Sequence, residues 1–183
     1  MNPKPNERIL DLCAAPGGKA AYTAQLIQNQ GHILAEDLHP DRLKLIEENC
    51  ARLGLSCVRT RLISAPEPDH RFDRVLVDAP CSNTGVMRRR VDLRWRIQPR
   101  ELERLQADQL RLLERAAAQV RVGGAIVYST CSLEPEENSD VVRLFLQNRS
   151  GYRLVHERQL LPFADGFDGA YVAQVEKLTE LSE

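Results

Sequence analysis

Two of the five cysteines in this chain stand beside polar residues directly after apolar runs. Cys81 follows the run 72–78, and Cys131 follows the run 125–129. A thiolate is a strong nucleophile, and covalent catalysis divides one difficult step into easier ones. Because an unperturbed thiol is only about 3% ionised at pH 7, such a site needs a nearby cation or a helix N-terminus. Both thiols are therefore candidate nucleophiles, and their positions alone do not rank them; a buried cysteine is otherwise a small apolar residue.

A glycine turn at 13–19 offers a second candidate site, between a predicted strand and a predicted helix. It lacks the G-x-G-x-x-G dinucleotide pattern, and Ala20 stands where a P-loop has the Ser or Thr that holds magnesium. Asp37 lies twenty residues after Gly17, a position from which a carboxylate accepts hydrogen bonds from ribose hydroxyls. The pattern favours a nucleoside without a polyphosphate, S-adenosylmethionine first, over the alternative of a tight structural turn with a solvated Asp.

A methyl donor beside a thiol suggests one kind of chemistry. Carbon 5 of a pyrimidine is a poor nucleophile, but adding a thiolate to carbon 6 makes carbon 5 electron-rich enough to accept a methyl group. The reaction also needs an acid or hydrogen-bond partner near ring N3 and a base for the carbon 5 proton. Asp78, three residues before Cys81, is the candidate for N3, and Cys131 precedes a predicted helix start at Pro135 whose dipole would favour the thiolate.

Alternating strand and helix patterns must position these residues. The sequence predicts the elements in chain order: strand 8–12, helix 19–29, strand 33–37, helix 41–53, strand 56–61, strand 72–78, helix 101–120, strand 125–129, helix 135–148, and strands 152–155 and 170–175. Such alternation predicts a doubly wound α/β fold with a mostly parallel sheet, and the last two strands are expected to form an antiparallel edge. In this fold ligands bind beyond the carboxyl ends of the strands, so the polar clusters converge on one rim.

Composition limits the class of protein. The 183 residues fit a single domain, 1–183, with 43% hydrophobic and 28% charged residues, as in globular proteins. There is no apolar run of membrane-spanning length and no signal peptide, and the odd cysteine count without a Cys-x-x-Cys pair argues against disulfides or zinc. We therefore expect a cytoplasmic monomer in a reducing compartment, without a metal and away from membranes.

An arginine cluster follows the Cys81 turn. The segment 84–104 carries a net charge of +4, from seven arginines and three acids, although the whole chain carries −1. Guanidinium groups bind phosphates, and an interleaved tryptophan can stack on a base. A solvated face is the alternative, but the position beside the candidate site favours RNA binding, with strong salt dependence, by Arg88, Arg89, Arg90, Arg94 and Trp95.

Three motifs together resemble the Sun (Fmu) group of RNA cytosine-C5 methyltransferases. They are Asp11-Leu12-Cys13-Ala14-Ala15-Pro16-Gly17-Gly18-Lys19, Asp78-Ala79-Pro80-Cys81-Ser82 with Gly85, and Thr130-Cys131-Ser132 with Pro135-Glu136-Glu137-Asn138. The resemblance covers nearly the whole chain, including 168–173. It implies a Rossmann-like methyltransferase fold, Cys131 as the nucleophile, Cys81 as the residue that assists release of the adduct, and ribosomal RNA, 16S above all, as the substrate. It also implies that Asp78 faces both cofactor and base, and that the cofactor is lined by Asp37 and by Cys13, Ala14, Ala15, Pro16, Gly17, Gly18 and Lys19.

The chain departs from that family's pattern in two places. Family members usually carry an acid just beyond the third strand, near the adenine of the cofactor, where this chain reads Arg61-Leu62-Ile63-Ser64. They also have residues before the first motif, including an RNA-binding region, whereas this chain starts almost at the first strand. Two alternatives therefore remain open: a weakly active or inactive domain that binds RNA or cofactor, and an enzyme that methylates another acceptor such as DNA cytosine.

Overall fold

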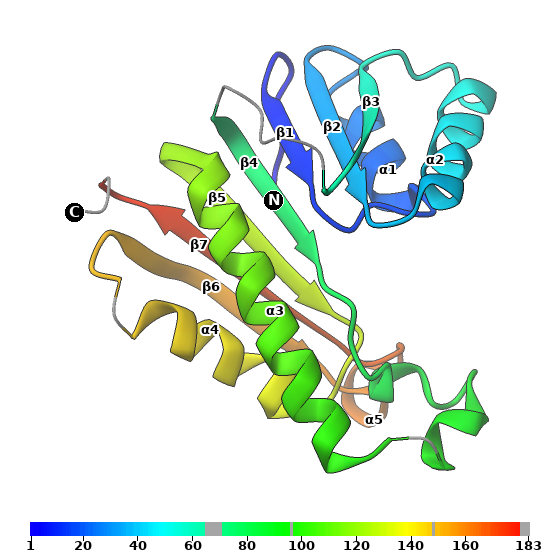
Figure 1. The fold of residues 1–183 in the computed structure, drawn as a ribbon, viewed down its shortest axis with the longest axis vertical. Helices are drawn as coiled ribbons and strands as arrows, with labels where there is room; N and C mark the ends of the chain where they lie inside the picture. Colours follow the sequence, from blue (N-terminus) through cyan, green and yellow to red (C-terminus); the bar gives the residue numbers. More distant parts are fainter. Residues whose placement is uncertain (65–70, 96, 148, 180–183) are drawn as a thin grey trace.

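The computed structural model describes residues 1–64, 71–95, 97–147 and 149–179 (Figure 1). Its strands are β1 Arg8–Asp11, β2 His32–Asp37, β3 Val58–Leu62, β4 Phe72–Asp78, β5 Val120–Thr130, β6 Tyr152–Leu160 and β7 Ala170–Lys177. Its α-helices are α1 Gly18–Leu26, α2 Pro40–Arg52, α3 Pro99–Gln119, α4 Ser139–Leu146 and α5 Pro162–Asp165. Short 3₁₀ helices are η1 Thr84–Val86, η2 Val91–Trp95 and η3 Pro135–Glu137.

The strands form one sheet in the order β3-β2-β1-β4-β5-β7-β6. β1 to β5 pair in parallel with one another, and β7 pairs antiparallel with both β5 and β6. The predicted doubly wound α/β fold with an antiparallel C-terminal edge is confirmed. The strand order reverses between β1 and β4, so the carboxyl ends of these strands define the expected binding crevice.

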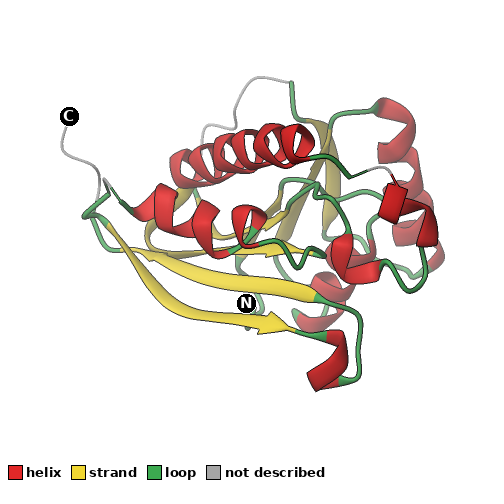
Figure 2. Cartoon of the chain, turned by 90° about the horizontal axis from the view of Figure 1, so that it is seen from below, coloured by secondary structure: helices red, strands yellow, loops and turns green. Residues whose placement is uncertain are grey.

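Helices cover both faces of the sheet. Its strands are therefore buried on two sides and need apolar residues at successive positions. In β1, Leu10 belongs to a cluster with Leu113 of α3 and Phe145 of α4, whereas Ile9 belongs to a second cluster with Ile46 of α2. Figures 1 and 2 show α3 and α4 together over one face of the sheet. Among the described residues, no helix is long and apolar enough to cross a membrane.

Several predicted elements differ from the structure. The predicted helix 19–29 ends earlier, since α1 stops at Leu26, and the predicted strand 152–155 is longer, since β6 extends to Leu160. The predicted helix 135–148 is wrong in its first turn: η3 is a single 3₁₀ turn, and α4 begins only at Ser139. Asn138 interrupts the helix, with φ −116° and ψ −106°, because its side chain bonds Thr130 and the Ser132 carbonyl instead. The predicted helix end at Asn148 lies outside the described residues.

The fifth strand is longer than predicted, since β5 begins at Val120 and includes Gly124. A Cβ on Gly124 would lie 2.8 Å from the Asp73 carbonyl oxygen, so only glycine lets β5 approach β4 this closely. The apolar pattern shows only the continuously buried half of this strand, because Arg121, Val122 and Gly123 between the buried Val120 and Gly124 are exposed.

Candidate active site

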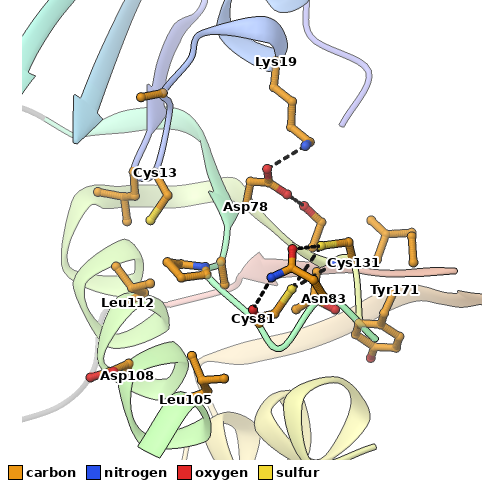
Figure 3. A pocket seen from close by; sticks show the side chains of 18 of the residues that line it. Cys13, Lys19, Asp78, Cys81, Asn83, Leu105, Asp108, Leu112, Cys131 and Tyr171 are labelled. Carbon is orange, nitrogen blue, oxygen red and sulfur yellow. Dashed lines mark hydrogen bonds and ion pairs between the residues drawn. The ribbon is translucent and has the colours of Figure 1, made fainter. Parts of the chain in front are cut away.

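A cavity of about 880 Å³ opens at the carboxyl ends of the parallel strands, a volume typical of cofactor sites (Figure 3). Of the predicted site residues it is lined by Cys13, Ala15, Lys19, Asp37, Asp78, Cys81 and Cys131. These residues come from four separate stretches of sequence, so the predicted convergence on one rim is confirmed by the fold. No group of three or more His, Cys, Asp or Glu residues among the described residues could hold a metal ion.

The glycine turn is held from behind by helix α2. Arg42 donates to the Ala15 carbonyl over 2.9 Å, and Asn49 donates to the Pro16 carbonyl over 3.0 Å. Gly17 has φ +99°, and a Cβ there would lie 3.1 Å from the Ile46 Cα, so this position requires glycine. At Gly18, by contrast, a Cβ would meet nothing within 4 Å. The turn is thus packed tightly on one side and open on the other.

Asp37 lies at the end of β2, on the wall of the cavity, and is 3% exposed. It accepts a hydrogen bond from the Ala15 amide over 3.2 Å and lies 3.3 Å from the Arg42 guanidinium. Its neighbours Leu38 and Ile63 also line the cavity, so the wall at the end of β3 is apolar at the position where an acid was expected. Arg61 points instead to the buried Glu36, which Arg115 of α3 also contacts.

Asp11, at the end of β1, is a fully buried carboxylate beneath this turn. Burial, with a smaller contribution from the Asp78 charge, raises its pKa to about 7. Burial likewise raises the pKa of Cys13 to about 12, which leaves that thiol protonated at neutral pH. Cys13 is thus a wall residue of the cavity rather than a nucleophile.

The two candidate thiols, which follow β4 and β5, are in direct contact. The Cys81 and Cys131 sulfurs are 3.2 Å apart, and the Cys131 amide donates to the Cys81 sulfur over 3.3 Å. Figure 3 shows both sulfurs beside Asn83, on the Asp78 side of the cavity. Parallel pairing brings them together, since Asp78 lies opposite Ser129 in the β4–β5 register.

The electrostatics distinguish the two thiols. The hydrogen bond from Cys81 lowers the pKa of Cys131, and Lys19 lowers it further, while burial and Asp78 oppose the shift. The pKa of Cys81 is raised, because its proton is held in the hydrogen bond to Cys131 and because the group is buried. The predicted helix dipole at Pro135 is absent, since η3 is only one 3₁₀ turn. Cys131 is therefore the thiol that ionises more readily.

Asp78 links the two halves of the cavity. Lys19 donates to one of its oxygens over 2.6 Å, and Ser129 donates to the other over 2.8 Å (Figure 3). Because the carboxylate is 35% exposed and lines the cavity, its remaining lone pairs face the space between the glycine turn and the thiols. The residue thus lies between the glycine turn and the two thiols.

A buried carboxylate fixes the turns that carry the thiols. Glu137, fully buried, accepts from the Ser82 amide over 2.9 Å and from Gln109 over 3.0 Å. Its second oxygen accepts from the Ser132 hydroxyl over 2.5 Å and from the Ser82 hydroxyl. Ser82 and Ser132 directly follow the two cysteines, so this one side chain holds both turns.

Of the arginine cluster, Arg88, Arg89 and Arg90 lie outside the lining of the cavity, whereas Arg104 lines it. Arg88 and Arg89 both pair with Asp168, at 3.4 and 3.0 Å, and the amide of Gly169 donates to the Gly85 carbonyl over 2.8 Å. Arg90 is exposed and Trp95 is 84% exposed, whereas the side chain of Arg94 lies outside the described part of the chain. Arg88, Arg89 and Arg90 therefore follow the thiol-bearing turn without lining the cavity.

Several site residues escape prediction from sequence. Arg42 and Asn49 hold the glycine turn. Asn83 contacts Cys131, and Ser129 contacts Asp78. Glu137 joins the two cysteine turns. Glu137 has one recognisable signal, its place in the Pro-Glu-Glu-Asn motif. The others are ordinary polar residues of helices, turns and strands, whose partners depend on the packing of distant segments.

The sheet, the glycine turn and the cavity beyond β1 and β4 define a Rossmann-like methyltransferase. Residues 1–176 match the family model of the 16S rRNA methyltransferases RsmB/F, and the chain belongs to this family, which uses S-adenosylmethionine. The resemblance to the Sun group is thereby confirmed.

Named relatives agree with this assignment. The chain is 36% identical over 199 residues to the probable ribosomal RNA small subunit methyltransferase B of Bacillus subtilis, and 39% identical over 189 residues to the ribosomal RNA small subunit methyltransferase B of Pectobacterium carotovorum. Each alignment covers 97% of this chain and 44% of the relative, so the chain spans less than half the length of these proteins.

Solved structures give the same fold. NSun6 from Pyrococcus horikoshii with SFG, an S-adenosylmethionine analogue, superposes with a TM-score of 0.89 at 32% identity, covering 97% of this chain and 50% of that one. A methyltransferase homologue from the same organism gives 0.84 at 33% identity, covering 97% and 64%.

Proposed function

We propose that this chain transfers a methyl group from S-adenosylmethionine to carbon 5 of a cytosine in RNA, 16S ribosomal RNA first, through a covalent adduct of Cys131. The observation that carries the proposal is the pair of sulfurs 3.2 Å apart on the wall of a nucleoside-sized cavity. A methyltransferase that acts on an oxygen or an exocyclic nitrogen has no need of two contacting thiols. The chemistry of carbon 5 needs at least one.

The residues around the glycine turn fit the cofactor. Asp37 would accept from the ribose hydroxyls, Leu38 and Ile63 would pack against the adenine, and Asp78 would face the sulfonium end. Cys13, Ala14, Ala15, Pro16, Gly17, Gly18 and Lys19 would contact the same molecule from the turn. The bound cofactor would supply an electrophilic methyl group. An apolar residue at position 63 costs the adenine amino group one acceptor, which weakens binding without preventing it.

Cys131 acts as the nucleophile in this proposal. Its sulfur would add to carbon 6 of the pyrimidine, and the ring electrons that move to carbon 5 would form the new bond to the methyl group as the bond from that methyl group to the donor sulfur breaks and its electrons stay on that sulfur. The lowered pKa of Cys131 supports this role, as does the Lys19 cation on its side of the cavity. The raised pKa of Cys81 supports a different role for that thiol, which stays protonated and can donate its proton.

Cys81 assists release of the product. After methyl transfer the carbon 5 proton leaves, its electrons form the carbon 5–carbon 6 double bond, and the carbon 6–sulfur electrons return to Cys131. A thiol 3.2 Å away can donate its proton to the departing thiolate. Loss of Cys81 should therefore stall the reaction after the adduct has formed.

Asp78 gives the site its preference for cytosine. Both oxygens already accept hydrogen bonds, from Lys19 and Ser129, and further lone pairs remain for a ligand. The 4-amino group of cytosine donates to such an acceptor, whereas the 4-oxo group of uracil does not. Asp78 would thus accept from the 4-amino group and share a proton with N3 while Cys131 attacks carbon 6.

RNA would approach across the arginine cluster. Arg88, Arg89 and Arg90 offer guanidinium groups to phosphates, with Arg94 and the exposed Trp95 next to them. Replacing Arg89 and Arg90 with Gln should weaken RNA binding and lower the slope of log affinity against log salt by about two. An unchanged slope would remove these residues from the phosphate contacts.

Trapping on RNA that contains 5-fluorocytidine, with S-adenosylmethionine present, tests the proposal. Fluorine cannot leave as a proton, so the active protein should accumulate as a covalent complex on a denaturing gel. Cys131→Ser should abolish this complex and Cys81→Ser should retain it. The reverse result would exchange the two roles, and no complex with either thiol intact would leave only a domain that binds RNA or cofactor.

A further inference from the structure

Asn83, two residues after Cys81, lies in the left-handed backbone region, which asparagine adopts more readily than other non-glycine residues. Its φ is +62° and its ψ +26°, in the left-handed region, where most residues other than glycine are strained. Glycine would satisfy this turn at lower cost.

The amide of Asn83 is held in one orientation by its own turn. Its nitrogen donates to the Cys81 carbonyl over 2.7 Å, and this bond leaves the amide oxygen on the opposite side. That oxygen lies 2.9 Å from the Cys131 sulfur (Figure 3). An amide oxygen only accepts hydrogen bonds, so the hydrogen between the two atoms belongs to the thiol.

The direction of every hydrogen bond around the sulfurs follows from this contact. The Cys131 thiol donates to Asn83, so the Cys81 thiol donates to the Cys131 sulfur across the 3.2 Å contact. The Cys81 sulfur in turn accepts from the Cys131 amide. Asn83, which accepts from Cys131, therefore stabilises the thiol form of Cys131, whereas Cys81, which donates to it, stabilises the thiolate form.

We propose that Asn83 is a positioning residue that holds Cys131 in its protonated resting form, with the sulfur directed into the cavity between Asn83 and Cys81. The proposal rests on the proposed role of Cys131 as the nucleophile and extends it. When substrate binds, ionisation of Cys131 requires that this acceptor bond be given up. Asn83 thus limits the reactivity of the thiol in the free protein.

Other groups face the same sulfur from the elements around it. Lys19 of α1 favours the thiolate, and Asp78 at the end of β4 opposes it. Arg158 of β6 and Tyr171 of β7 line the same cavity, and the Tyr171 hydroxyl donates to Glu157. These charges stay in place when Asn83 changes, so a substitution at this position isolates the effect of the amide.

The test is the pH dependence of Cys131 alkylation by iodoacetamide, followed by mass spectrometry of the peptide that contains residue 131. Asn83→Gly keeps the backbone conformation and removes the acceptor, so the midpoint should fall and the rate at pH 7 should rise about threefold to tenfold. Asn83→Asp places a carboxylate beside the sulfur, so the midpoint should rise and the rate at pH 7 should fall about tenfold. Asn6→Gly, the same substitution at an exposed residue with φ +68°, is the matched control and should change neither.

An unchanged alkylation midpoint in Asn83→Gly would overturn the proposal. A raised midpoint would overturn it too, because it would mean that the amide nitrogen of Asn83, and not its oxygen, faces the sulfur. If Asn83→Gly does not fold, judged by its thermal unfolding, Asn83→Ala decides the matter, because it also removes the acceptor and its midpoint must move downward. Alkylation needs no RNA, so its result is independent of the 5-fluorocytidine trap. A shifted midpoint without a trapped complex would preserve the role of Asn83 toward the thiol and reject the cytosine chemistry.

Discussion

Replacing Glu137 with Gln should destabilise the protein and loosen both cysteine turns. The carboxylate is fully buried and accepts four hydrogen bonds: two at one oxygen, from the Ser82 amide and Gln109, and two at the other, from the hydroxyls of Ser82 and Ser132. A glutamine can keep its oxygen toward the amide donors. Its nitrogen then faces the two hydroxyls, which can rotate to accept.

The magnitude follows from the change in each bond. A hydrogen bond to a charged group contributes about 1 kcal/mol more than a neutral one, so the four weakened bonds together lose about 4 kcal/mol. A neutral amide costs less to bury than a carboxylate, which offsets part of this loss. We expect a net decrease of about 2 kcal/mol in the free energy of unfolding, or a fall of about 4 to 8 °C in the melting temperature for a chain of this size.

Thermal and urea unfolding measure this change, with Glu136→Gln as the control. Glu136 is the adjacent acid and is exposed, so its substitution should alter stability by less than about 0.5 kcal/mol. Alkylation of Cys81 and Cys131 should become faster in Glu137→Gln because their turns are less firmly held. If Glu137→Gln has the same free energy of unfolding as Glu136→Gln, and its cysteines are alkylated at the rate of the original protein, the four hydrogen bonds to Glu137 do not hold the two turns in solution.

Three further predictions concern the cofactor side of the site. Asp11 has a pKa of about 7 when folded and an ordinary value of 3.8 when unfolded, so the folded state binds its proton more tightly and stability falls as pH rises from about 4 to 7. Asp11→Asn should remove this fall, gaining up to about 4 kcal/mol relative to the original protein between pH 4 and 8 in urea unfolding; parallel curves would contradict it. Gly17→Ala should cost about 1 to 3 kcal/mol, because of φ +99° and the contact with Ile46, whereas Gly18→Ala, which meets nothing within 4 Å, should cost little. Lys19→Gln removes a cation that lowers the pKa of Cys131, so its alkylation midpoint should move to higher pH; an unchanged or lower midpoint would contradict a role for Lys19 in the ionisation of Cys131.

The sequence by itself determined the elements and the rim on which the chemistry lies. Short apolar runs that end in glycine or proline turns and alternate with helical patterns indicate buried strands of a parallel sheet, and the carboxyl ends of such strands share one edge. Asp37, Asp78, Cys81 and Cys131 were therefore brought to one cavity by local patterns alone. The first motif also required glycine at position 17, which the structure explains by the close approach of α2.

Tertiary structure alone decided how these residues interact. Whether two thiols touch, and which of them ionises, depends on distances of a few tenths of an ångström between turns fifty residues apart. Asn83, Arg42 and Glu137 became site residues for the same reason, since hydrogen bonds and Coulomb interactions depend on separation and direction. The break at Asn138 shows the limit most clearly: helix propensity favours one continuous helix, and bonds from Asn138 to the neighbouring strand and turn outweigh it.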